Sequence, residues 1–113
     1  MNINPNDYIN VEEAVARLGG NRKLYERLIQ QFIDDGYTAA VENAFQSGDE
    51  NEISRQVHAL KGVSANLSFS KVTSSCIEIE NCIKSGLDYT DGMEKLREVL
   101  GETERVIALS VAE

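Results

Sequence analysis

The sequence is poor in residues that break helices and in residues that build metal or disulfide sites. Its 113 residues include one proline, no tryptophan, one histidine and two cysteines. Cys76 and Cys82 form neither a C-x-x-C motif nor a zinc-binding spacing, and on one helix they would point in different directions. We therefore expect both cysteines to be reduced and packed as small apolar side chains, and we expect no metal site.

Long apolar runs and positive charge are also scarce. No stretch approaches the roughly 18 apolar residues of a membrane span, and the polar residues 1–10 lack the features of a signal peptide. The formal net charge is −8, with acidic residues spread along the chain, so a nucleic-acid partner is not expected. These absences predict a cytoplasmic domain whose partner is another protein.

The hydrophobic spacing is helical in every segment with a clear period, and no segment alternates as a strand does. We expect helices over residues 10–18, from residue 21 to a break at Gly36, and over 37–45, 50–67, 72–83 and 90–109. Leu24, Leu28, Ile29 and Phe32, with Ile33, form the predicted apolar face of the second helix. The expected fold is all-α, an antiparallel up-and-down four-helix bundle with a short additional N-terminal helix. Residues 10–113 form the predicted domain, and residues 1–9 form an N-terminal segment.

The helix over residues 50–67 carries an unusual outward stripe. Its apolar seam comprises Ile53, Val57, Leu60, Ser64 and Leu67. At about 100° per residue, His58 lies roughly 140° from the centre of that seam and is predicted to face outward. Lys61, Gly62 and Ala65 follow at +3, +4 and +7 and share this side.

A mid-helix glycine costs about 1 kcal/mol relative to alanine, so Gly62 needs a reason. Beside an exposed histidine, it removes side-chain bulk and lets another protein approach the ring. His58 is a competent nucleophile, and Lys61 supplies positive charge for an anion on the ring. Plainer interpretations remain open: a surface histidine, a solubilising lysine, and a glycine that permits close packing between helices.

Residues 58–67, which read HALKGVSANL, closely resemble the signature H-x-L-K-G-x-(S/A)-x-x-(L/V/I)-G of histidine phosphotransfer (Hpt) domains. The resemblance extends over roughly residues 10–87 and includes LGGN at 18–21, Gly48-Asp49, and Cys76 with Ile79-Glu80. The last helix agrees in length and pattern. Ser68 departs from the family pattern, which commonly has glycine there. A glycine would ease a left-handed turn, whereas a serine can cap the next helix.

The resemblance implies a role for each matching residue. His58 would carry the phosphoryl group, through Nε2. Lys61 would stabilise that group, and Gly62 would give the partner access. Glu80, on the neighbouring helix, would hydrogen-bond the other ring nitrogen and orient the imidazole.

The resemblance also implies partners. Response-regulator receiver domains, and a hybrid sensor histidine kinase, would exchange phosphoryl groups with His58, docking over Ala59 and Ala65. The chain would be a monomeric carrier in a two-component phosphorelay and not an independent enzyme. It would lack autokinase activity and a cofactor of its own, with Mg²⁺ supplied by the receiver.

Two other functions remain as alternatives. The chain could be an interaction bundle that binds receivers without transfer, although the intact His58, Lys61 and Gly62 argue against this. It could also be the dimerisation domain of a sensor kinase. In that class an acidic residue follows the histidine and a proline lies downstream, whereas here Ala59 follows and no proline occurs after Pro5.

Overall fold

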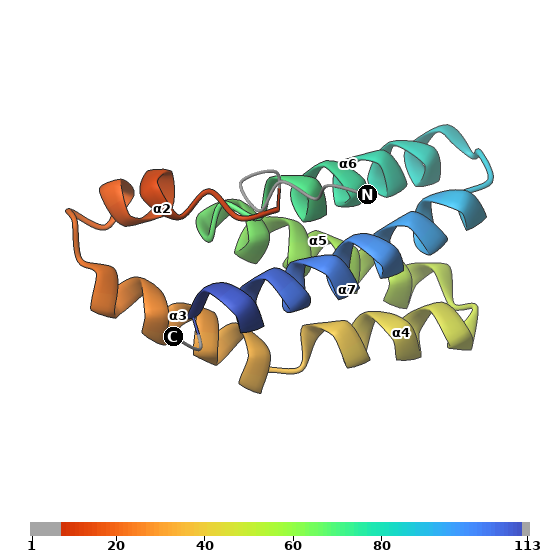
Figure 1. Cartoon of the computed structure of the whole chain (residues 1–113). Helices are drawn as coiled ribbons and strands as arrows, with labels where there is room; N and C mark the ends of the chain where they lie inside the picture. Colours follow the sequence, from red (N-terminus) through yellow and green to blue (C-terminus); the bar gives the residue numbers. More distant parts are fainter. Residues whose placement is uncertain (1–7, 112–113) are drawn as a thin grey trace, which may run out of the picture.

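A computed structural model describes residues 8–111, so most of the predicted N-terminal segment lies outside the described residues. The described part is helical and contains no strand, which confirms the predicted all-α class (Figure 1). The helices with defined bounds are α2 (Val11–Arg17), α3 (Arg22–Asp34), α4 (Tyr37–Ser47), α5 (Glu50–Asn66), α6 (Ser70–Ser85) and α7 (Thr90–Val111). No helix in this part of the chain has the length and apolar character needed to cross a membrane.

Short polar side chains and glycines define where the helices begin and end. Asn10 and Asn21 cap α2 and α3 by accepting hydrogen bonds from the backbone N–H groups three residues ahead at 3.1 and 3.0 Å. Asp49 caps α5 in the same manner. Gly36 has a φ of +69°, which an L side chain rarely adopts, and it separates α3 from α4 at the predicted position.

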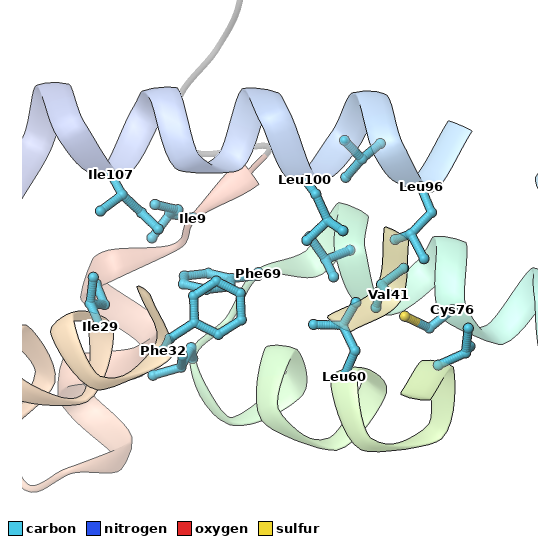
Figure 2. Close-up of a cluster of buried hydrophobic side chains, with 14 of the residues drawn as sticks. Ile9, Ile29, Phe32, Val41, Leu60, Phe69, Cys76, Leu96, Leu100 and Ile107 are labelled. Carbon is cyan, nitrogen blue, oxygen red and sulfur yellow. The ribbon is translucent and has the colours of Figure 1, made fainter. Parts of the chain in front are cut away.

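The helix that carries His58 lies within a closed cycle of contacts. α4 packs on α5, α5 on α6, α6 on α7, and α7 back on α4. The side chains between them form one buried cluster, part of which appears in Figure 2. Ile9 joins this cluster although it precedes the predicted domain boundary, and α3 contributes Ile29 and Phe32. α5 is therefore held on two sides and keeps its third side free for solvent.

The predicted apolar face of α3 was wrong at one position. Ile33 is 45% exposed, whereas Tyr25, which the hydrophobic pattern did not assign to the core, is buried. Tyr25, Ile29 and Phe32 follow the i, i+4, i+7 spacing of one face, and Ile33 is rotated about 100° away from Phe32. The Tyr25 hydroxyl donates to the Leu67 carbonyl at 2.9 Å, and burial raises its pKa to about 12.

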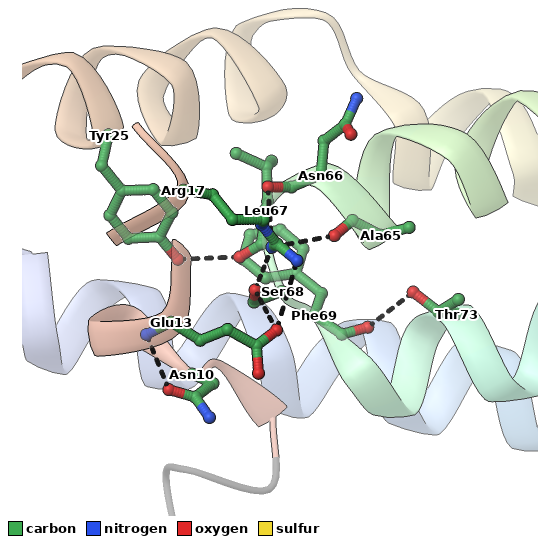
Figure 3. Close-up of polar contacts among 10 residues, drawn as sticks. All are labelled: Asn10, Glu13, Arg17, Tyr25, Ala65, Asn66, Leu67, Ser68, Phe69 and Thr73. Carbon is green, nitrogen blue, oxygen red and sulfur yellow. Dashed lines mark hydrogen bonds and ion pairs between the residues drawn. The ribbon is translucent and has the colours of Figure 1, made fainter. Parts of the chain in front are cut away.

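Ser68 does not cap the next helix, so that expectation was wrong. It adopts the left-handed conformation itself, with a φ of +60°, and Phe69 stands at the N-cap of α6. Its hydroxyl is engaged by α2 instead: it donates to Glu13 at 3.0 Å and accepts from Arg17 (Figure 3). Arg17 also donates to the Ala65 and Asn66 carbonyls at 3.1 and 3.2 Å. A side chain of α2 thus provides hydrogen bonds for backbone carbonyls at the C-terminal end of α5, which have no partner within that helix.

Both cysteines are free, as expected. Cys76 is buried and Cys82 is half-buried. Burial, with a smaller contribution from Glu80, raises the pKa of the Cys76 thiol to about 12. Cys76 thus behaves as a small core residue and is not a reactive thiol.

Candidate functional site

His58 lies on the solvent side of α5. Its side chain is 73% exposed, whereas Ile53, Val57 and Leu60 are buried on the opposite side. Gly62, Ala59 and Ala65 are exposed around it, and Lys61 is half-buried. The helical wheel therefore placed the stripe on the correct side, because α5 is a regular helix whose contacts with α4 and α6 leave this side exposed.

Glu80 of α6 joins His58 to Lys61. Its Oε1 lies 3.3 Å from His58 Nδ1, and its Oε2 accepts a hydrogen bond from Lys61 Nζ at 2.9 Å. The Glu80 side chain is only 15% exposed, because α5 and α6 pack closely here. One carboxylate thus contacts both the imidazole and the ammonium group.

The charge on Glu80 follows from this environment. Burial by itself would raise the pKa of its carboxyl, but the hydrogen bonds from Lys61 and His58, with their charges, lower it below the ordinary value. The group is therefore ionised at neutral pH, and an ionised carboxylate only accepts hydrogen bonds. Its contact with His58 is satisfied when Nδ1 carries the ring proton, and Nε2 then has a free lone pair.

Gly62 has no packing reason to be glycine. Apart from its chain neighbours and the adjacent backbone of α5, a Cβ built on it would meet no atom within 4 Å, so the alternative of close packing between helices is wrong. Gly92 shows the contrast, since a Cβ there would lie 3.1 Å from the Ile79 side chain. What Gly62 provides is open space one turn from the imidazole.

The site continues beyond the residues that the sequence predicted. A shallow open concavity holds His58, Lys61 and Glu80, and its remaining lining consists of Asn51, Ser54, Arg55, Ile83 and Lys84. Sequence reasoning missed these residues although a signal existed. Ser54 and Arg55 precede His58 by four and three residues, and Lys84 follows Glu80 by four.

Among the residues that line this concavity, only Glu80 carries a carboxylate. No group of three or more histidine, cysteine, aspartate or glutamate side chains suited to a metal occurs among residues 8–111. The carboxylate closest to the ring, that of Glu80, already has Lys61 as its partner. The chemistry that this arrangement offers is an accessible imidazole nucleophile with a nearby cation.

Comparison with protein-family models shows the family to which the chain belongs. The family model of the Hpt domain matches residues 23–108, which include the whole site. The chain belongs to the Hpt domain family. Hpt domains carry phosphoryl groups on histidine in the phosphorelays of two-component signalling. Comparison of this Hpt domain with curated proteins and with solved structures finds no significant match.

Proposed function

We propose that this Hpt domain shuttles a phosphoryl group between receiver-domain aspartates, with His58 Nε2 as the point of attachment. The observation that carries the proposal is the exposed imidazole whose Nδ1 faces the Glu80 carboxylate at 3.3 Å. This contact leaves Nε2 directed away from the carboxylate, because the two nitrogens lie on different edges of the ring. Nε2 is thus the nitrogen that a partner protein can reach.

The transfer step is a displacement at phosphorus. The Nε2 lone pair attacks the phosphorus of an aspartyl phosphate, an N–P bond forms, and the P–O bond breaks as the aspartate carboxylate leaves. The ring becomes positively charged while Nδ1 keeps its proton, and the ionised Glu80 stabilises that charge. The reverse displacement returns the group to a second receiver.

Lys61 and Gly62 assist this step in different ways. Lys61 is 30% exposed at its side chain and lies one turn from His58, within reach of a phosphoryl group on the ring. Gly62, with open space above it, lets the receiver surface approach over Ala59 and Ala65. We propose that the receiver supplies the Mg²⁺, because Glu80 is the one carboxylate that lines this concavity and it is already paired.

The remaining parts of the proposal concern the chain as a whole. The closed cycle of contacts among α4, α5, α6 and α7 supports an antiparallel four-helix unit. In this unit α3 leads directly into α4 and extends it, and α2 is the additional helix. We propose that residues 10–113 act as one monomeric carrier domain in the cytoplasm. It would serve receivers or a hybrid sensor kinase and would not phosphorylate itself.

Incubation with a receiver domain phosphorylated on aspartate tests the proposal. Acid-labile label should appear on the wild type and should be absent from His58→Gln, with matching circular dichroism spectra. Equal labelling of both proteins, or of neither, would overturn the assignment. Measured binding without transfer would favour the interaction bundle, and an obligate dimer in sedimentation would favour the kinase dimerisation domain.

A further inference from the structure

Two hydroxyl groups meet between α5 and α6, one helical turn from Lys61. Ser64 Oγ lies 2.8 Å from Thr73 Oγ1, and either hydroxyl can donate to the other. Ser64 is fully buried in the core seam of α5, and Thr73 is half-buried on α6. This hydrogen bond, the Ser64–Thr73 link, therefore joins the helix that carries His58 to the helix that carries Glu80.

The two hydroxyl groups have two protons for three contacts. Besides each other, Ser64 Oγ contacts the Lys61 carbonyl oxygen at 3.0 Å, and Thr73 Oγ1 contacts the Phe69 carbonyl oxygen at 3.2 Å. If Thr73 donates to Ser64, the Ser64 proton goes to the Lys61 carbonyl. If Ser64 donates to Thr73, the Thr73 proton goes to the Phe69 carbonyl. The link between the helices is made in both arrangements, and each arrangement anchors it to backbone.

A short link of this kind limits how far α6 can slide along α5. Apolar contacts are non-directional and tolerate small sliding movements, whereas a hydrogen bond weakens steeply when its geometry departs from a narrow range. The position of each hydroxyl oxygen depends on a single side-chain torsion. The Glu80 carboxylate lies at the end of three torsions, so its own contacts restrain sliding much less.

The link lies close enough to the site for sliding to matter there. Thr73 precedes Glu80 by seven residues, which places the two on one face of α6 about 10 Å apart. Ser64 follows Lys61 by three residues on α5. Movement of α6 along α5 would shift Glu80 against His58 Nδ1 and Lys61 Nζ, which its carboxylate contacts at 3.3 and 2.9 Å. A displacement of about 1 Å is enough to slow a reaction strongly.

We infer that Thr73 is a positioning residue for phosphotransfer, which with Ser64 fixes the register of α6 on α5 and so keeps the Glu80 carboxylate against the His58 ring. This inference rests on the proposed function. Thr73 does not touch the phosphoryl group and acts through Glu80. The aligned carboxylate holds the ring proton on Nδ1 and leaves the Nε2 lone pair free to attack phosphorus.

Hydroxyl removal at two threonines tests the inference. Thr73→Val removes one end of the link and keeps the β-branched shape, and Thr73→Ser keeps the hydroxyl. Thr103→Val is the matched control, because Thr103 is buried in α7 and its hydroxyl has no hydrogen-bond partner within residues 8–111. Ser64→Ala removes the other end of the link, so it serves as a second test if Thr73→Val does not fold.

Two measurements report on the ring without a receiver. His58 is the only histidine, so ¹⁵N NMR of its ring nitrogens gives the share of the neutral ring that carries its proton on Nδ1. Labelling by phosphoramidate, a small phosphoryl donor, gives the reactivity of Nε2. A hydrogen bond shifts an equilibrium by about two- to tenfold, and the link can change the aligned population by no more than this. Thr73→Val and Ser64→Ala should therefore slow labelling by about two- to tenfold and move the Nδ1-protonated share toward that of Glu80→Ala.

Thr73→Ser and Thr103→Val should match the wild type in both measurements. In the Glu80→Ala background, Thr73→Val should cause no further change, because the residue through which it acts is gone. A full effect in that background overturns the positioning role. Wild-type values for Thr73→Val and Ser64→Ala also overturn it, and a lower melting temperature with these values assigns the link to stability alone. No labelling of the folded wild type overturns the proposed function instead, and the Nδ1-protonated share then decides on the link by itself.

Discussion

Replacement of Gly62 by glutamine should change stability and phosphotransfer in opposite directions. Gly62 is exposed in the middle of α5 and has no positive φ, and an added Cβ would meet no atom within 4 Å apart from its chain neighbours and the adjacent backbone of α5. Glycine is about 0.5 to 1 kcal/mol less favourable than glutamine at such a position. For a domain of this size the gain corresponds to a rise of about 2 to 5 °C in melting temperature.

The same side chain should obstruct the receiver. A glutamine at position 62 would stand one helical turn from His58, on the surface that the receiver must approach. Displacing the reacting groups by about 1 Å can slow a reaction by about 100-fold, so we expect receiver-dependent transfer to fall by at least about tenfold. Phosphoramidate is small enough to avoid the obstruction, and it should label Gly62→Gln at a rate close to that of the wild type.

Gly101 provides the matched control for this experiment. It lies in α7, is exposed, and likewise has nothing within 4 Å of an added Cβ. It does not line the His58 concavity. Gly101→Gln should therefore stabilise the protein to a similar extent and leave receiver-dependent transfer unchanged. Wild-type transfer rates in Gly62→Gln would refute the access argument, and a lower melting temperature would refute the structural one.

Three further predictions concern the contacts around the site. Lys61→Ala should slow receiver-dependent transfer by several-fold in the radiolabel assay, yet lower the free energy of unfolding by only about 1 kcal/mol or less, since the pair is partly exposed. The pKa of Glu80 is lowered in the folded state, so its stabilising contribution is present above about pH 4.3 and is lost as the pH falls through the lowered value. Denaturant titrations from pH 7 to pH 3 should show a smaller acid-induced loss in Glu80→Gln than in the wild type. Ser68→Ala should lower stability by about 1 to 2 kcal/mol, because the left-handed backbone stays while the bonds to Glu13 and Arg17 are lost. Ser68→Gly should be closer to neutral in the same titration, since glycine relieves the backbone; an equal loss in both variants would contradict this.

Local patterns were sufficient to predict most of the helices and the site stripe. Asn10, Asn21 and Gly36 set helix ends through the backbone within a few residues of themselves, so these helix ends can be predicted from the local sequence. His58 and Gly62 face solvent because α5 is regular and its apolar seam fixes which side is buried. The prediction for Ser68 failed because its hydrogen-bond partners are distant in the sequence. Ser68 is held by residues more than 50 positions away.

By itself, the sequence determined the helical fold, the outward position of His58 and the residues that share its face. All of these follow from a period of 3.6 residues and from burial of one face of each helix. The resemblance implied the contact between Glu80 and His58, but only the tertiary structure decided that Lys61 shares the same carboxylate and that Lys84 lines the same concavity. Those facts depend on how α5 and α6 are each rotated about their own axes and on the distance between the two helices. Packing of both helices against the common core sets these two quantities, and the spacing along either helix does not.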